Sequence, residues 1–485
     1  MPGLAKIITK NTAFLLLGQI GIAGLNAVTI VLLARYWGEY RFGVYSYAMV
    51  LVGFFTLLPD FGMKPILIRE IARNRANAQA IVSNALLLKL ALTAISILVL
   101  CASMFAFSKD PVLRSAVPIL SLSMLLSSKS GTVRIVFESL FHADMEMKYP
   151  VLFQGLDIVI QTAVVVCLVL FRAGFHFILI GIVASSIPGL LFTVFYTKKR
   201  MTLVWKPHKG EMTSLLRKAS PLFVYLLLAM LYERLDVFFL KSFWGDSQVG
   251  LYSSAFRMTA PLAFIPYAIA TALYPLFSKN SAEQERISDR FFGFGLKALL
   301  VIGAAIGSAG ILFGKSFFGI YGSLYAEAAT PFQVLLWGQA VSFLTFFLVD
   351  FNNSQNRQLH NTVYMAVMVF FAFWVQRYLI LRLGVLGASW AKIILNATGL
   401  AVLSAMAWNH LSLQQRRHVY TTAWILGLFL MAACGSFLRS VPFWMKGVTF
   451  GAAIAVCIRW LFSKEEKQLL RKMVQQYQTQ SGTAT

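Results

Sequence analysis

Charge is scarce in this chain of 485 residues. Only 13% of the residues are charged, and the acidic ones are the rarer kind, with 19 Asp and Glu against 43 Lys and Arg. Soluble globular domains carry roughly a quarter charged residues, whereas this chain is 58% apolar with a mean hydropathy of +0.70. The shortage of charge excludes a soluble globular protein and predicts an all-α polytopic membrane protein.

The patterns that support catalysis, ATP binding or metal binding are also missing. The four cysteines and six histidines are scattered without the spacing of a metal or redox site. The nearest approach to a phosphate-binding loop, AGILFGKS at 309–316, has alanine where the first glycine belongs and follows a hydrophobic segment instead of a strand. We therefore expect a transporter and not an enzyme or an ATP-driven pump, with no cofactor and no metal.

Hydrophobic segments of about 20 residues are long enough to cross a bilayer core of roughly 30 Å. About fourteen such segments follow one another along the chain, and they predict as many transmembrane helices. They cover 12–34, 42–59, 82–107, 115–141, 151–171, 175–196, 221–243, 250–277, 292–313, 328–349, 362–381, 385–408, 420–438 and 441–462.

Basic residues are distributed unequally between the two sets of loops. The set that includes both termini holds 24 of the 43 Lys and Arg, and the opposite loops hold 10. Because cytoplasmic loops carry the excess of positive charge, both termini are predicted to be cytoplasmic. This placement accounts for most of the net charge of +24 without a nucleic-acid partner.

A twelve-residue pattern occurs twice, as WGEYRFGVYSYA at 37–48 and WGDSQVGLYSSA at 244–255, with six identical residues. Each copy lies between the first and second segments of a block of six, so the two blocks enter the membrane with the same orientation. The glycines are expected to allow a tight turn at the outer hairpin of each block. We predict two parallel six-helix lobes that face each other across a cleft, followed by two extra helices.

The predicted divisions follow from this duplication. They are an N-lobe at 1–196, a cytoplasmic linker at 197–218, a C-lobe at 219–408, spans thirteen and fourteen at 419–462 and a cytoplasmic tail at 463–485. The two extra spans either pack against the lobes or line a groove for a lipid tail. The tail, with the sequence EEKQLLRKMVQQY, is expected to form a short amphipathic helix on the membrane surface.

Nine basic residues fall inside the predicted spans, where a Lys or Arg at the helix centre costs about 2.5–3.5 kcal/mol. Such residues normally face a polar cavity or a partner. The side chains of Lys89 and Lys297 are also near enough to a span end to reach the membrane surface. The predicted contacts to an anionic pyrophosphate or glycan are Arg257, Lys129, Lys392, Arg234, Lys297, Lys89 and Arg134.

Acidic residues in the spans are fewer. Glu138 follows Arg134 by four positions, a spacing that brings side chains together on a helix. Asp157, Asp236 and Glu233 are candidates for ion coupling, although an interhelical ion pair is the commoner fate of a carboxylate such as Asp157. Because cations outnumber acids, a cleft lined by these residues would have a positive potential, and we expect an anionic cargo.

Longer motifs resemble a known family. The stretch 32–74 contains AR-x-x-G-x-x-x-FG-x-Y, then DFG, then I-RE-IAR, and the second half contains ERLDVFFL at 233–240, VGLYSSAFRM at 249–258 and GVLGASWAK at 384–392. These motifs resemble the polysaccharide-transport branch of the MOP flippase superfamily, the Wzx-type oligosaccharide flippases. Together with the fourteen spans, the resemblance covers nearly the whole chain.

The resemblance implies a two-lobed transporter of the bacterial inner membrane that moves undecaprenyl-pyrophosphate-linked oligosaccharide units to the periplasmic leaflet. Its partners would be this lipid-linked substrate, the bilayer, and a glycan polymerase or chain-length machinery. Arg257 and Asp236 lie within the matching motifs, so a role near the lobe interface carries over most readily to them.

Three other functions remain open at this point. A MATE-type cation antiporter would share the fold but requires an acid-dominated cavity, which this composition does not favour. A peptidoglycan precursor (lipid II) flippase would also use basic residues, but its amino-terminal motif differs. A membrane-bound polymerase or ligase is disfavoured because the predicted outer loops are only a few residues long.

Overall fold

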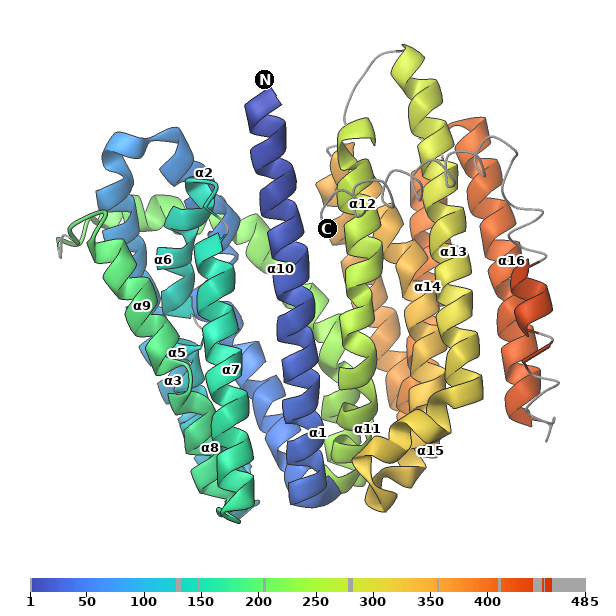
Figure 1. The fold of residues 1–485 in the computed structure, drawn as a ribbon, viewed down its shortest axis with the longest axis horizontal. Helices are drawn as coiled ribbons and strands as arrows, with labels where there is room; N and C mark the ends of the chain where they lie inside the picture. The colour runs from blue at the N-terminus through green and yellow to red at the C-terminus, as the bar shows by residue number, and fades with distance from the viewer. Residues whose placement is uncertain are drawn as a thin grey trace, which may run out of the picture. The chain divides into compact units, whose positions relative to one another are not determined.

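A computed structural model describes residues 2–127, 132–146, 148–203, 206–277, 282–355, 357–408, 411–438, 447–448 and 450–455 (Figure 1). Throughout these ranges the regular structure is helical. Seven of the helical segments are long and apolar enough to cross a membrane. The structure therefore confirms an all-α polytopic membrane protein.

The helices follow one another with short connections. In the first half they are α1 (Pro2–Asp60), α2 (Met63–Arg73), η1 (Arg75–Asn77), α3 (Ala78–Phe107), α4 (Pro111–Ser121), α5 (Ser123–Leu126), α6 (Thr132–Ala143), α7 (Lys148–Leu170), α8 (Phe175–Ala184), α9 (Ile187–Lys198) and α10 (Lys209–Trp244). In the second half they are α11 (Asp246–Thr259), η2 (Ala260–Ala263), α12 (Phe264–Phe277), α13 (Ala282–Phe318), η3 (Gly319–Tyr321), η4 (Ser323–Ala328), α14 (Ala329–Ser354), α15 (Gln358–Ala407) and α16 (Leu413–Leu438).

Two of the long helices each contain two predicted spans. Gly38 interrupts α1 with φ 69°, and Gly384 interrupts α15 with φ 56°. Glycine adopts such left-handed conformations without a steric penalty. The two arms of α15 pack on each other, since a Cβ added at Gly399 would lie 2.5 Å from the Tyr364 hydroxyl.

Three other predicted spans are interrupted, and one of them, at 250–277, is divided among α11, η2 and α12. The span at 115–141 is divided among α4, α5 and α6, and its polar run at 128–131 lies outside the described residues. The span at 175–196 is divided into α8 and α9, with Pro188 in the first turn of α9. Proline lacks the N–H that a continuing helix needs but fits a first turn, so the helix restarts there.

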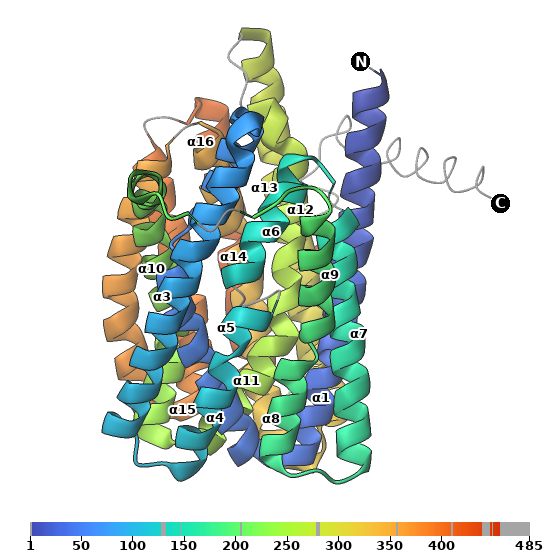
Figure 2. The same cartoon turned by 90° about the vertical axis from the view of Figure 1, so that its left-hand side faces the viewer.

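The described chain forms two compact units. Unit 1 contains residues 1–254 and 321–324, and unit 2 contains 255–320 and 325–485. Unit 1 extends beyond the predicted linker, because α10 packs on α1, α2 and α3. One apolar core of unit 1 joins Met63 and Leu67 of α2 with Val136 of α6 and Leu215 of α10. Figure 2 shows α3, α6, α7 and α9 of this unit running alongside one another.

Unit 2 is built around α14. This helix packs against α12, α13 and α15, and most of its side chains are buried. The helix α16, predicted as the thirteenth span, packs on α13, and its Phe429 and Ala433 share a core with Trp337. These contacts support a packing role for α16. Most of the predicted fourteenth span and all of the amphipathic tail lie outside the described residues.

Candidate functional site

Three buried charges meet around Arg134 of α6 in unit 1. The guanidinium is fully buried, its Nε donates to Oε1 of Glu138 at 3.1 Å, and its Nη1 donates to Oδ2 of Asp157 on α7. Glu138 and Asp157 are buried as well. The contact expected from the spacing of Arg134 and Glu138 is present, and Asp157 has joined an interhelical ion pair.

Gly189 of α9 leaves room for this ion pair. A Cβ added at Gly189 would overlap Oδ1 of Asp157 and would lie 2.9 Å from Nη1 of Arg134. The backbone of α9 therefore covers the pair directly. Removing one partner of a buried ion pair typically costs about 3–5 kcal/mol, because the other charge is left buried.

Lys89 of α3 has a carboxylate partner at the end of α1. Its ammonium is fully buried and donates to Oδ1 of Asp60 at 3.1 Å and to the Asp60 carbonyl oxygen at 3.4 Å. The expectation that Lys89 reaches the membrane surface is wrong. Left-handed conformations at Phe61 (φ 47°) and Gly62 (φ 68°) end α1, and the carboxylate that precedes them is held against α3.

Another buried carboxylate of unit 1 accepts a hydrogen bond from a tyrosine. Asp236 of α10 is buried, and the Tyr252 hydroxyl of α11 donates to its Oδ2 at 2.5 Å. Glu233 and Arg234 lie one turn earlier on α10, where Glu233 is exposed and Arg234 half-buried. The structure therefore places the ion-coupling candidates Asp157 and Asp236 in two different hydrogen-bonded settings.

The repeated turn has the same backbone conformation in both copies. Gly38 and Gly245 stand 207 positions apart, at equivalent places in the pattern. Their φ angles are 69° and 82°, with ψ of 176° and −170°. A residue with a side chain is strained in this conformation, so the predicted role of the glycines in a tight turn is confirmed.

The two copies also touch each other inside unit 1. A Cβ added at Gly43 would overlap the Asp246 carbonyl oxygen and lie 3.0 Å from the Gly250 nitrogen. A Cβ added at Gly250 would overlap the Glu39 carbonyl oxygen and lie 3.1 Å from the Gly43 nitrogen. Gly43 is equivalent to Gly250, and Glu39 to Asp246. The contact is therefore reciprocal, as a local twofold axis between the copies requires.

An ion pair lies beside the contact between the two repeated turns. The Lys241 ammonium of α10 contacts Asp246, is 3.7 Å from Oδ2 of Asp110 and is 5.5 Å from the centre of the Tyr47 ring. Burial raises the pKa of the Asp246 carboxyl, and the hydrogen bond from Lys241 opposes that rise. Asp110 also caps α4, where it accepts from the Val112 nitrogen at 2.9 Å.

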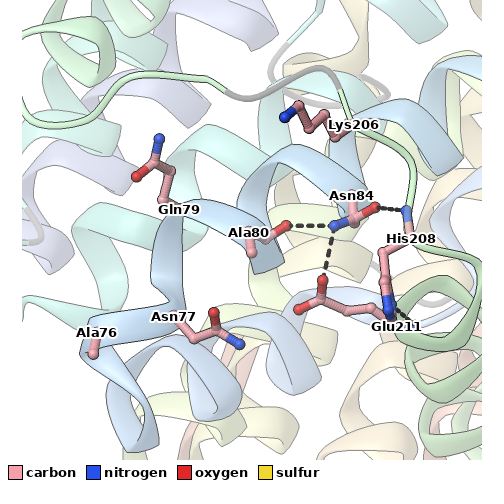
Figure 3. Close-up of a pocket in the computed structure, with 8 residues that line it drawn as sticks. All are labelled: Ala76, Asn77, Gln79, Ala80, Asn84, Lys206, His208 and Glu211. Carbon is pink, nitrogen blue, oxygen red and sulfur yellow. Dashed lines mark hydrogen bonds between the residues drawn. The ribbon is translucent and has the colours of Figure 1, made fainter.

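A polar pocket of about 590 Å³ lies between the start of α3 and the segment before α10 (Figure 3). Asn84 joins the two sides of the pocket. Its side-chain amide donates to Glu211 at 2.7 Å, and its side-chain oxygen accepts from the His208 backbone nitrogen at 2.8 Å. The predicted linker is therefore attached to α3 at this point. The other lining residues are Ala76, Asn77, Gln79, Ala80 and Lys206.

The remaining predicted cations belong to unit 2, except Lys129, which lies outside the described residues. Lys392 of α15 and Lys297 of α13 are buried, and Arg257 of α11 is half-buried. The Lys392 ammonium is 5.7 Å from the centre of the Phe256 ring, next in sequence to Arg257. The sequence AGILFGKS at 309–316, which partly resembles a phosphate-binding loop, lies inside α13. No phosphate-binding loop therefore forms there.

Two residues of these clusters, Asp60 and Gly189, are absent from the predicted site residues. Asp60 lies just beyond the predicted span at 42–59, and Gly189 carries no signal apart from being a glycine. A search for acids just beyond a span end, opposite an embedded lysine, would have found Asp60.

The sequence matches two families. The family model described as polysaccharide biosynthesis protein matches residues 8–281, which is more than half of the chain. The MatE model matches residues 221–379. No protein among the curated sequences matches the chain.

Several solved structures have a similar fold at 13% sequence identity. The lipid II flippase MurJ in an inward closed conformation has a TM-score of 0.70, over 91% of this chain and 98% of that one. The MATE multidrug transporter DinF-BH, solved as a complex, has a TM-score of 0.62, over 86% and 96%. A mutant of the Vibrio cholerae MATE transporter VcmN has a TM-score of 0.53, over 85% and 99%. At this identity the likeness shows the shared fold alone.

Proposed function

Because this chain belongs to the polysaccharide biosynthesis protein family, within the MOP superfamily of flippases and transporters, we propose that it is an oligosaccharide flippase. It moves undecaprenyl-pyrophosphate-linked units of O-antigen, capsule or exopolysaccharide from the cytoplasmic to the periplasmic leaflet of the bacterial inner membrane. The cargo is translocated without any change in its covalent bonds.

One observation supports this proposal above the others: the polysaccharide family match covers residues 8–281 of a chain that has the fold of MurJ and the MATE transporters. The excess of basic residues agrees with an anionic lipid-linked cargo, since 43 Lys and Arg stand against 19 Asp and Glu. A positive surface raises the local concentration of anions and speeds their association.

In this proposal the pyrophosphate is bound by basic residues of the predicted spans. They are Arg257, Lys297 and Lys392, together with Arg234 and Lys129. Lys89 and Arg134 are fully buried and held by carboxylates, so we assign them to the shape and charge balance of unit 1. Asp157, Asp236 and Glu233 remain our proposed sites of ion coupling.

The sugar passes through the aqueous interior while the isoprenoid tail stays in lipid. Direction comes either from an ion gradient or from consumption of the product outside by a glycan polymerase or chain-length machinery. We propose that the reciprocal contact of Gly43 with Asp246 and of Gly250 with Glu39 lies at the periplasmic ends of the two repeats. We propose that these contacts separate when the transporter opens outward.

Reconstitution into liposomes tests the function. A fluorescent short-chain polyprenyl-pyrophosphate-linked N-acetylglucosamine is placed in the inner leaflet, and a membrane-impermeant quencher reports its arrival in the outer leaflet. We expect transfer well above that of protein-free liposomes. Absence of transfer in liposomes that contain folded protein would contradict the proposal.

A second function has its own support in the MatE match at residues 221–379. A cation antiporter would export ethidium from the same liposomes and leave the lipid-linked sugar in place. A lipid II flippase would move a lipid II analogue in preference to a lipid-linked sugar that lacks the peptide. The three assays on one preparation separate these functions.

A further inference from the structure

Two carboxylates share one ammonium beside the contact between the two repeated turns. The Lys241 ammonium of α10 donates to Oδ2 of Asp246 at the start of α11, and it is 3.7 Å from Oδ2 of Asp110, the residue that caps α4. Among the described side chains no other cation lies within 4.0 Å of either carboxylate. If both aspartates are charged, the cluster therefore carries one negative charge more than Lys241 can balance.

One oxygen atom of this cluster is buried without a donor. Only 8% of Asp246 is exposed, and its Oδ1 receives no hydrogen bond from any described residue. The corresponding oxygen of Asp110 is occupied, because it accepts from the Val112 nitrogen at 2.9 Å and from the Leu113 nitrogen at 3.3 Å. A buried acceptor that is left unpaired is destabilising, and more so when it is charged. The charged form of Asp246 is therefore poorly accommodated at this place.

The helices around the two carboxylates supply no further counter-charge. Tyr40 and Tyr47 of α1 interact with them, and phenols are neutral at pH 7. Arg114 of α4 donates to backbone carbonyl oxygens, and His176 of α8 is hydrogen-bonded to Ser115. The other charged residues on these elements lie beyond ion-pair distance of the two carboxylates, and they are Glu39, Arg41 and Lys109.

Two carboxylates at one site repel each other, and a single proton shared between them removes the repulsion. The side chains of Asp110 and Asp246 are close enough to hydrogen-bond to each other, which requires that one of them carries a proton. Burial and this contact raise the pKa of the Asp246 carboxyl, whereas Lys241 opposes the rise. We propose that Asp110 and Asp246 bind one proton between them while the two repeated turns are in contact.

A metal ion fits this cluster less well than a proton. The Lys241 ammonium contacts Asp246 directly and would repel a metal cation held by the same carboxylate. In the part of the chain that the structure describes, no group of three or more His, Cys, Asp or Glu side chains could hold a metal ion. The proton needs only the oxygen atoms that Asp110 and Asp246 already provide.

The proton links the contact between the turns to pH. The Asp246 carbonyl oxygen is the atom that packs against Gly43, so a force on Asp246 is a force on that contact. With the proton bound, the two carboxyls attract each other through a hydrogen bond, and without it they repel. Acid therefore favours the turns in contact, and separation of the turns hydrates the carboxyls and releases the proton.

Infrared spectroscopy of the purified full-length protein tests the site, because a protonated carboxyl has its own C=O band. Spectra recorded between about pH 4 and pH 8 should contain a carboxyl band that is missing from both Asp246→Asn and Asp110→Asn. This band should persist to a higher pH than that of an ordinary aspartate, whose pKa is 3.8. Asparagine has the shape of aspartate and also caps helices well, so both variants keep the local structure. The matched control is Asp144→Asn, which removes an aspartate paired with Arg75 and Arg200 and should leave the band in place.

Gly250→Ala tests the link to the contact between the turns. Its methyl group overlaps the Glu39 carbonyl oxygen and pushes the turns apart, so the band should disappear at a lower pH than in the unsubstituted protein. Gly24→Ala meets nothing within 4 Å and should leave the titration unchanged. A band that titrates identically in Gly250→Ala would overturn the link between the proton and the contact.

Three other results would overturn the site itself. Spectra of Asp246→Asn and Asp110→Asn that retain the band would show that neither aspartate is protonated. A band missing from Asp246→Asn alone would show that the proton is not shared. Loss of the band when sodium chloride replaces choline chloride would assign the two carboxylates to a metal cation. The measurement involves no cargo, so each of these results leaves the flippase proposal standing.

Discussion

Arg134 shows how a charge is kept inside an apolar helix bundle. The guanidinium has hydrogen-bond partners on its own helix and on α7, and α9 approaches it through a residue without a side chain. A buried charge is tolerated only when partners compensate for the lost hydration. The glycine at position 189 is therefore as necessary to the cluster as the two carboxylates.

Gly189→Ala should lower the free energy of unfolding by about 2 kcal/mol or more, because the added methyl group overlaps Asp157 and forces the ion pair apart. Gly155→Ala on α7 is the matched control, since a Cβ there meets nothing within 4 Å. Alanine is the better helix former, so this control should be as stable as the unsubstituted protein or slightly more stable. Thermal unfolding of the purified proteins measures both, and equal midpoints for the two variants would contradict the packing argument.

His142 gives a prediction for pH. Partial burial lowers its pKa in the folded protein from 6.5 to about 4, so the half-buried neutral ring contributes stability that is fully present above about pH 6.5 and is lost as the pH falls toward 4. The thermal midpoint should therefore fall between pH 7 and pH 4.5, and it should fall less in His142→Gln. Identical pH profiles of the two proteins would show that His142 titrates normally.

The structure adds a contact to the repeated turn that the sequence did not predict. Its glycines were expected to permit a turn, and Gly38 and Gly245 do so. Gly43 and Gly250 have a different role, because the absence of a side chain lets a backbone carbonyl of the other copy pack against each of them. Two elements far apart in the sequence are thus held together by main chain, which explains why a pattern with only six identities keeps both glycines.

Gly43→Ala and Gly250→Ala should each lower the thermal midpoint, because either methyl group pushes the two turns apart. Since both residues serve one contact, the double variant should lose less stability than the two single variants added together. Gly24→Ala, also on α1, meets nothing within 4 Å and should leave the midpoint unchanged. Strictly additive losses would mean that the two glycines serve separate contacts.

Over the whole molecule, the basic residues fall into two groups. One group lies in the loops and termini, where it sets the predicted membrane orientation, and the other lies inside the predicted spans. The loops and termini account for most of the 43 basic residues, and in unit 1 the buried Lys89 and Arg134 are balanced by acids. The charge left for an anionic cargo is therefore smaller than the composition suggests, and part of it lies in unit 2.

Charge-neutral substitution of Arg257, Lys129 and Lys392 should lower surface glycan in cells, because the pyrophosphate would lose its counter-charges, while the amount of protein in the membrane stays the same. Glycan staining of single and triple variants, with immunoblots of the membrane fraction, measures both quantities. Arg382 is the control, since it lies in a predicted outer loop with its guanidinium 4.5 Å from the centre of the Tyr378 ring. Normal glycan in the triple variant would remove these residues from the proposed site.

Hydropathy and the repeat predicted the helical class and most helix positions, because a span is a local property of about 20 neighbouring residues. The contact of Arg134 with Glu138 was also predictable, since four positions separate the two on one helix. The pairing of Lys89 with Asp60 was not, because 29 positions and a left-handed break lie between them.

The amino-acid sequence by itself determined that this protein lies in a membrane as helices, and it predicts that the two halves are related and that the cargo is anionic. The helical class depends on composition and on neighbouring residues, which any fold of the chain would share. Only the tertiary structure decided which cations are neutralised, because an ion pair depends on a few ångströms between helices that the sequence keeps far apart. It also decided that the two repeated turns meet through Gly43 and Gly250, since only glycine lets two backbones approach so closely.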